Sequence, residues 1–258
     1  MAAVPMEQPA AEHPLPLTGE RTMPDIDHEH YWFTRHLAAY RWAGQFCRGT
    51  VLDAGAGEGY GTAELAKEAT LAIAMDLDHR TCAHAMRRYP EVVAITGNLW
   101  SWPLATASVD VVISMQVIEH LWDPSAFFAE AHRCLRPGGL LVVSTPNRLT
   151  FSPGLARGER PLNPFHVEEF DGAQLVGMVV HQDFQQITLT GVLDGAGDAL
   201  DQELMGHSSP ADWSTTLRER VARTSVADFP IAEVVDPNDP GQRILDLIVT
   251  ARTGDDAG

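Results

Sequence analysis

Four polar side chains near the middle of the chain have the types and spacing of a catalytic or metal-binding group. Gln116, Glu119 and His120 occur at positions i, i+3 and i+4, which share one face of a helix, so we expect them to converge. His166 follows after a loop that begins at Thr145. Carboxylate, amide and imidazole groups can ligate a divalent cation, and a histidine can also act alone as a general base. The spacing leaves both chemistries open.

A glycine-rich stretch earlier in the chain predicts a bound ligand of the nucleotide type. The segment Val51-Leu-Asp-Ala-Gly-Ala-Gly-Glu-Gly-Tyr-Gly61 joins a short apolar run to alternating glycines, among them Gly55, Gly57 and Gly59. Glycines let the backbone turn tightly and approach a ligand without a Cβ in the way. A dinucleotide fingerprint that starts at Gly55 needs a glycine where this chain has Tyr60, so a pyrophosphate-binding turn is disfavoured.

Two carboxylates accompany this turn. Asp53 lies inside it, where its side chain can orient the glycine turn or the amino group of a ligand. A second predicted strand, Leu71-Ala-Ile-Ala-Met-Asp76, ends in a carboxylate that can accept hydrogen bonds from both hydroxyls of a ribose. We expect Leu77, the next residue, and Met115, at the end of a later strand, to line the same ligand.

Taken in order, these segments resemble the motifs of the class I S-adenosylmethionine (SAM) methyltransferases. The glycine turn and the ribose acid are followed by Thr96-Gly-Asn98-Leu-Trp-Ser-Trp-Pro-Leu104, which is similar to the family's adenine segment, with Asn98 in place of the usual Asp. Residues 109–114 and 135–144 are similar to the fourth and fifth strands. The resemblance covers about residues 49 to 150 and implies SAM as the cofactor, with Asn98 and Leu99 beside its adenine.

The group around Gln116 resembles a further motif of this superfamily. Glu119-His120 with the distal His166 is similar to the E-x-x-E-H set that binds a divalent metal in small-RNA 2′-O-methyltransferases and, in part, in ubiquinone-pathway O-methyltransferases. This resemblance implies a Mg²⁺ site formed by Gln116, Glu119, His120 and His166, with catalytic roles for the last three. Gln116 replaces the first glutamate. Metal-free members also carry the E-H pair, so a metal-free general base stays the alternative.

At whole-chain scale the sequence resembles the mycobacterial sugar O-methyltransferases of the polymethylated polysaccharide pathways. The similarity rests on residues 17–24, 31–36, 57–61, 116–124, 144–153 and 163–166. It implies a small oligosaccharide substrate, and the nearest such activity is 1-O-methylation of a 3-O-methylmannose oligosaccharide, a precursor of methylmannose polysaccharide. Aromatic rings mixed with hydrogen-bonding groups suit a sugar, and the residues expected to bind the acceptor are Arg21, Tyr31, Trp32, Arg35 and Asn147.

Two other functions stay open. A phenol or quinone-precursor O-methyltransferase needs a more apolar acceptor pocket than Arg21, Arg35 and Trp32 predict. A non-catalytic SAM-binding protein with the same fold would bind the cofactor without turnover, and the loss of His166 would not affect it.

Composition excludes several classes of protein. At 258 residues and 45% apolar content, the chain can bury one substantial α/β core, and no apolar stretch predicts a membrane span or a signal peptide. A net charge of −17 disfavours nucleic acid as a partner, because it repels polyanions. Cys47, Cys82 and Cys134 fall in predicted helical stretches without C-x-x-C spacing, which indicates reduced thiols in the cytoplasm.

The predicted fold is α/β and Rossmann-like, with a seven-stranded, mostly parallel mixed sheet, an antiparallel last strand, and helices on both faces. We expect a disordered tail over residues 1–17 and one methyltransferase domain over residues 18–258. Within the domain, an N-terminal cap spans about residues 18–47 and a lid insertion spans about residues 192–243. Formation of a homodimer is left open.

Overall fold

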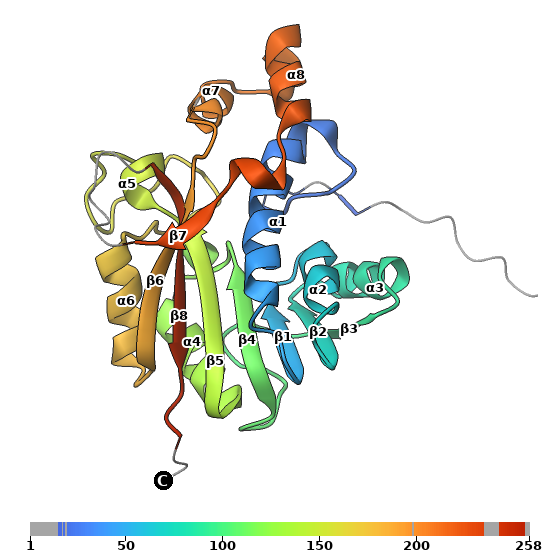
Figure 1. The fold of residues 1–258 in the computed structure, drawn as a ribbon, viewed down its shortest axis with the longest axis vertical. Helices are drawn as coiled ribbons and strands as arrows, with labels where there is room; N and C mark the ends of the chain where they lie inside the picture. The colour runs from blue at the N-terminus through green and yellow to red at the C-terminus, as the bar shows by residue number, and fades with distance from the viewer. Residues whose placement is uncertain (1–14, 17, 19, 198, 235–242, 256–258) are drawn as a thin grey trace, which may run out of the picture.

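The computed structural model describes residues 15–16, 18, 20–197, 199–234 and 243–255. Within these ranges one mixed sheet has the strand order β3-β2-β1-β4-β5-β8-β6-β7, with helices on both faces (Figure 1). The predicted Rossmann-like α/β class is confirmed. Most of the predicted tail, and residues 198 and 235–242 of the predicted lid, lie outside the described residues.

The strands that alternate with helices in the first half of the chain pair in parallel. They are β1 (Thr50–Ala54), β2 (Leu71–Asp76), β3 (Val92–Thr96), β4 (Val109–Met115) and β5 (Leu135–Pro146). The last strand, β8 (Ile244–Arg252), is antiparallel to β5 and to β6 (Gln185–Leu193), as predicted.

The predicted count of seven strands is wrong, because the sheet has eight. The additional strand is β7 (Ile231–Glu233), which pairs antiparallel with β6 at the edge of the sheet. It is three residues long, too short to produce a recognisable alternation of apolar and polar residues.

The α-helices are α1 (His30–Gly44), α2 (Tyr60–Leu65), α3 (His79–Arg88), α4 (Pro124–Cys134), α5 (Arg148–Phe151), α6 (Gly172–His181), α7 (Leu200–Met205) and α8 (Thr215–Arg223). Short 3₁₀ turns are η1 (Asp27–Glu29), η2 (Ile118–His120), η3 (Pro210–Asp212) and η4 (Val226–Asp228). No helix in the described part of the chain is long and apolar enough to cross a membrane.

Two apolar layers hold the helices on the sheet. Leu52 and Val112 pack in one cluster with residues of α4 and α6, whereas their neighbours Val51 and Val111 pack in another with residues of α1 and α2. Side chains alternate between faces along a strand, so strands that are apolar on both sides indicate a sheet buried under helices. In such a sheet the loops that follow β1, β2 and β4 meet at one edge, where ligands bind.

The insertion after β6 packs against the N-terminal helix. Helix α8 contacts α1 and η1, and the Nε2 atom of His30 lies 3.0 Å from the carbonyl oxygen of Thr224. Both α7 and α8 stand beyond one end of the sheet, opposite the end near the C-terminus (Figure 1). All three cysteines are free and buried, but Cys47 follows α1 and does not lie within a helix as predicted.

Candidate active site

The glycine turn after β1 adopts backbone conformations that favour glycine. Gly55, Gly57 and Gly59 have φ angles of 85°, 56° and 101°, in the left-handed region. At Gly59 a Cβ would also lie 2.7 Å from the Cβ of Ala85, so α2 could not approach α3 as closely with a larger residue. The backbone amides of Gly55 and Ala56 donate hydrogen bonds to the carbonyl of Met75, which ties the turn to β2.

A cavity of about 560 Å³ adjoins this turn, and we call it the glycine-turn cavity. Its volume is within the range of roughly 300–1,000 Å³ that is usual for cofactor sites. Of the predicted cofactor-binding residues, it is lined by Gly55, Gly57, Asp76, Leu77, Asn98, Leu99 and Met115. Asp53 and Gly59 are not among its lining residues.

Asp53 lies beneath the turn and supports it. Its carboxylate is fully buried and accepts hydrogen bonds from the Tyr40 hydroxyl, at 3.2 Å, and from Thr62 Oγ1, at 2.6 Å. Burial raises the pKa of Asp53 to about 7, although both hydrogen bonds oppose the shift. Asp76, by contrast, lines the cavity and accepts hydrogen bonds from the backbone amides of Gly57 and Asp78, so its carboxylate is oriented before any ligand arrives.

Sequence reasoning did not identify Glu58, the residue inside the turn that anchors it. The Glu58 side chain is buried, and its oxygens lie 2.7 Å from His84 Nε2 and 2.8 Å from the Tyr89 hydroxyl. Arg88 Nε lies 3.2 Å from the same carboxylate, and Arg88 also pairs with Asp25 in the N-terminal cap. His84 and Arg88 lie on α3 and Tyr89 directly follows it, but nothing in their spacing identifies Glu58 as their partner.

A second cavity of about 560 Å³ lies next to the first, and we call it the histidine cavity. Glu119, His120 and His166 line it, together with residues of the N-terminal cap, α5 and α7. The residues that line both cavities are Glu20, Arg21, Thr22, His36, Gln116 and His120. A ligand in one cavity therefore adjoins a ligand in the other.

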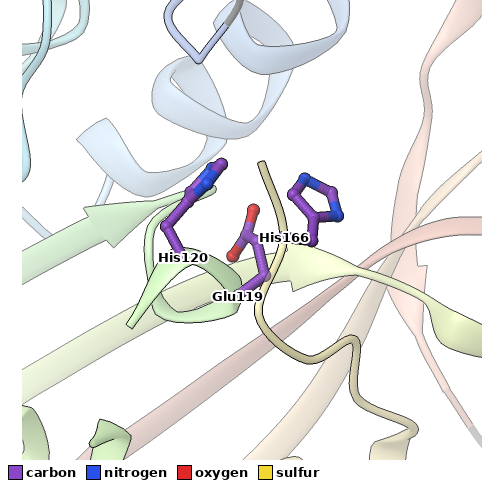
Figure 2. A group of neighbouring side chains, drawn as sticks. All are labelled: Glu119, His120 and His166. Carbon is purple, nitrogen blue, oxygen red and sulfur yellow. The ribbon is translucent and has the colours of Figure 1, made fainter. Parts of the chain in front are cut away.

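Glu119, His120 and His166 form a compact group in the histidine cavity. Each offers one ligand atom within 4.8 Å of the others, and the two imidazole rings lie 4.9 Å apart. Figure 2 shows the Glu119 carboxylate beside both rings, with His166 arriving from a separate segment. Among the described residues, this is the group of histidine, cysteine and acidic side chains that could hold a metal ion.

The predicted helical convergence of Gln116 with Glu119 and His120 is wrong. Gln116 has a φ of 57°, a left-handed conformation that a helix cannot include, and only Ile118–His120 form a 3₁₀ turn. The side-chain amide of Gln116 donates a hydrogen bond to Ser144 Oγ at 3.1 Å. Gln116 still lines both cavities, so it reaches the site from the end of β4 and not from a helix face.

The environment of Glu119 and His120 determines what each can do. Glu119 is buried, its Oε2 accepts a hydrogen bond from Thr145, and its Oε1 has no partner among the described residues. Burial raises the pKa of Glu119 to about 7, and the hydrogen bond from Thr145 opposes that shift. The Nδ1 atom of His120 lies 3.0 Å from the Phe165 carbonyl, which can only accept, so the ring carries its proton there and keeps a lone pair on Nε2.

Two residues that sequence reasoning missed, Asn163 and Glu169, set the state of His166. The Asn163 carbonyl oxygen accepts from the Phe165 amide, so its NH₂ group faces His166 Nε2 at 3.0 Å and donates to it. His166 Nδ1 must then carry the proton, which it donates to the buried Glu169 carboxylate at 2.7 Å. Asn163 and Glu169 flank His166 at three residues on either side in a loop, where no periodic pattern marks them.

The predicted acceptor-binding residues separate into two groups. Arg21, Trp32 and Arg35 line the histidine cavity. Tyr31 does not, because it packs against Phe229 and lines a separate cavity of about 190 Å³. Asn147 is also absent from the lining: it is buried, caps the start of α5 and donates a hydrogen bond to the Ile244 carbonyl at 3.1 Å.

Arg35, which lines the histidine cavity, forms a buried ion pair with Asp246. Its Nε lies 3.0 Å from Asp246 Oδ2, with both side chains at most 4% exposed. The guanidinium carbon lies 4.8 Å from the Trp32 ring centroid and 5.0 Å from that of Phe151. Burial raises the pKa of Asp246 to about 6, and Arg35 opposes the shift.

Comparisons with known proteins agree with this architecture. Residues 52–143 match a family model described as a methyltransferase domain. The chain is 41% identical over 258 residues to a "probable S-adenosylmethionine-dependent methyltransferase" of Mycobacterium tuberculosis, with 96% of this chain and 93% of the relative covered. A relative of the same description from Mycolicibacterium smegmatis is 42% identical over 248 residues, covering 92% of this chain and 95% of the relative.

Solved structures agree at the level of the fold. A SAM-dependent methyltransferase of Thermotoga maritima, described as a possible histamine N-methyltransferase, has a TM-score of 0.58 and 17% identity, covering 88% of this chain and 91% of that chain. At this identity the likeness concerns the fold alone. The similarity to the mycobacterial relatives extends over more than nine-tenths of each chain, and the fold has the glycine turn with an adjoining cavity. The chain therefore belongs to the SAM-dependent methyltransferases.

Proposed function

We propose that this protein transfers the methyl group of SAM to a hydroxyl of a small, neutral, polyhydroxylated acceptor, best a sugar. The observation that carries the proposal is the juxtaposition of two cavities, one at the glycine turn and one holding Glu119, His120 and His166. Methyl transfer is an in-line displacement, so donor and acceptor must meet where the cavities adjoin. The 1-O-methylation of a 3-O-methylmannose oligosaccharide is the specific activity that the sequence resemblance suggests.

The polarity of the histidine cavity supports a polyol as acceptor. Buried atoms without a partner in the described structure include Arg35 Nη1, Glu119 Oε1 and Glu169 Oε2, all on residues that line this cavity. Buried polar atoms need hydrogen bonds, and a ligand that offers both donors and acceptors supplies them. Trp32 adds an aromatic surface for the apolar face of a sugar ring.

The charges in the histidine cavity disfavour an anionic acceptor. Its lining includes four acidic residues and two arginines: Glu20, Glu29, Glu119, Glu169, Arg21 and Arg35. Arg35 is already paired with Asp246. A carboxylate or phosphate in this cavity would find little positive charge to compensate its desolvation.

The residues present can deprotonate a hydroxyl. His120 and His166 each keep a lone pair on Nε2, because the partners of Nδ1 are a carbonyl and a carboxylate. Glu169 stabilises the imidazolium that forms when His166 takes a proton, as a carboxylate does in other catalytic dyads. The acceptor oxygen thereby loses its proton as it attacks the methyl group.

Glu119, His120 and His166 also fit a divalent cation, and their ligand types favour some cations over others. Glu119 Oε1 and His120 Nε2 are unengaged among the described residues, whereas His166 Nε2 would have to release Asn163. One carboxylate with two imidazoles suits Mn²⁺, Co²⁺ or Zn²⁺ better than the predicted Mg²⁺, which prefers oxygen ligands. When bound, such a cation would polarise an acceptor hydroxyl and lower its pKa.

Methyl transfer to a panel of methylated and unmethylated glycosides, with and without EDTA, tests this proposal. We expect turnover on at least one glycoside, and Glu119→Gln or His166→Asn should lower kcat by at least ~10²–10⁴-fold. His79→Asn is the matched control, because His79 is exposed and lines neither cavity. SAM affinity, measured by calorimetry, should be similar in all variants.

Each contrary outcome identifies a different alternative. Full activity in EDTA would exclude a catalytic role for a divalent cation, and the histidines would then act as general bases. Turnover on phenols but on no glycoside would favour a phenol or quinone-precursor O-methyltransferase. Intact SAM binding without turnover on either panel, together with no loss of function in His166→Asn, would favour a non-catalytic SAM-binding protein.

A further inference from the structure

Arg21 occupies the junction between the two cavities. It lies in the segment of residues 20–22, which borders both cavities, and a Cβ on Gly57 would lie 3.8 Å from the Arg21 Cβ. Its side chain is 16% exposed. The Arg21 side chain therefore lies beside the glycine turn and borders both cavities.

Arg21 has hydrogen-bonding capacity that the protein does not use. Its Nη1 is buried and has no partner among the described residues. Its Nη2 is 3.9 Å from Asp78 Oδ2, which is too far for a hydrogen bond. A buried guanidinium nitrogen without an acceptor is costly, so an acceptor atom from a ligand is expected at this position.

Arg21 is also the one arginine or lysine among the described residues that line the glycine-turn cavity. The acids of that lining are Glu20, Glu58, Asp76 and Asp78. A ligand carboxylate is repelled by those acids, and Arg21 supplies the permanent positive charge in this lining that can pair with it. SAM carries such a carboxylate on its methionine moiety.

The direction of the cofactor agrees with this pairing. Asp76 and Asn98 line only the glycine-turn cavity, whereas Arg21 lines both cavities. The methionine end of SAM bears the transferable methyl group as well as the carboxylate, so this end must face the histidine cavity. We infer that Arg21 binds the carboxylate of the methionine moiety of SAM, and that it recognises the cofactor and not the acceptor.

The segment that carries Arg21 is anchored well enough to position it. The hydroxyls of Thr22 and Tyr60 are 2.8 Å apart, which ties the next residue to the start of α2. Further along, Asp25 pairs with Arg88 of α3 at 2.5 Å. Both anchors tie the N-terminal segment to helices that come after the glycine turn in the chain. The inference depends on the family and not on the identity of the acceptor.

Calorimetric binding of SAM and of decarboxylated SAM, which lacks only the carboxylate, tests the inference without any acceptor. Arg21→Met should weaken SAM binding about 10- to 100-fold, as expected for the loss of a hydrogen-bonded charge pair. The same variant should change the affinity for decarboxylated SAM less than about 3-fold. Arg21→Lys, which keeps the charge, should weaken SAM binding less than Arg21→Met.

Arg41→Met is the matched control, because it removes one positive charge from α1 outside both cavities. It should leave both affinities unchanged, which excludes a long-range effect of net charge. Equal weakening of both ligands by Arg21→Met would overturn the inference in favour of a role in shaping the cavity. No weakening of either ligand by Arg21→Met and Arg21→Lys would overturn it in favour of backbone amides as the carboxylate site.

Discussion

The ion pair of Arg35 and Asp246 offers the sharpest test of the energetics of this fold. Asp246→Asn removes the negative charge and leaves the Arg35 cation in a site where the arginine side chain is 4% exposed. Breaking a buried pair at one partner costs about 3–5 kcal/mol, because the remaining charge is uncompensated. The Trp32 and Phe151 rings contact the guanidinium in both proteins, so they do not change this difference. We therefore expect a loss of about 3–5 kcal/mol in the free energy of unfolding.

Removing both charges should recover most of that loss. In the double variant Arg35→Met with Asp246→Leu no buried charge remains, and replacement of a buried pair by apolar residues is often neutral or stabilising. Urea unfolding followed by circular dichroism and tryptophan fluorescence measures each variant, and an unchanged m-value establishes that the same unit unfolds. A double-mutant cycle then isolates the coupling, for which we expect about 2 kcal/mol or more.

Glu219→Gln is the control for this cycle. Glu219 pairs with Arg223 at 3.6 Å on the surface of α8, with both side chains more than half exposed, so its loss should have little effect. A cost below about 1 kcal/mol for Asp246→Asn, or losses of Arg35→Met and Asp246→Leu that simply add in the double variant, would refute a stabilising coupling between the two charges.

Two further predictions concern the carboxylates at the glycine turn. Asp76→Ala should weaken the binding of SAM and of decarboxylated SAM alike, by about 1.5–3 kcal/mol, because both ligands share the ribose; unchanged calorimetric affinities would remove Asp76 from the site. The pKa of Asp53 is about 7 in the folded protein, against 3.8 for the ordinary group, so the folded state holds this proton more tightly than the unfolded state. The stability that the protonated Asp53 side chain contributes is therefore fully present below about pH 4 and is lost as the pH rises toward 7. Between pH 5 and 6.5, Asp53→Asn should reduce the slope of the unfolding free energy against pH by about 1.4 kcal/mol per pH unit in urea unfolding, and equal slopes in both proteins would contradict this.

Local features of the fold could be predicted because their causes are local. The predicted strand at residues 71–76 has the bounds of β2, and the predicted fourth strand at residues 109–114 lies within β4 (Val109–Met115). The spacing of apolar residues within one element predicts which of its faces is buried, and the glycines of a turn predict the backbone conformation of that turn. Seven of the predicted cofactor-binding residues line one cavity, because the carboxyl ends of the strands in a parallel sheet meet at one edge.

Prediction failed where a local pattern was extended beyond what it determines. The i, i+3, i+4 spacing from Gln116 assumed a continuous helix, but the left-handed φ of Gln116 ends β4 abruptly, before the short turn Ile118–His120. Asn147 has the polar character of an acceptor-binding residue, yet its hydrogen bonds go to the start of α5 and to Ile244. Residue type alone does not distinguish a cap from a ligand-binding group, because the same amide can serve both.

The sequence by itself determined the class of the protein: the order of strands and helices, the glycine turn, and the residue types available for chemistry. Only the tertiary structure decided which of those residues meet. His166 joins Glu119 and His120, held by Asn163 and Glu169, and Arg35 on α1 pairs with Asp246 on β8. These partners are distant in the chain or lie in loops, so their contacts follow from how whole elements pack and not from any periodicity.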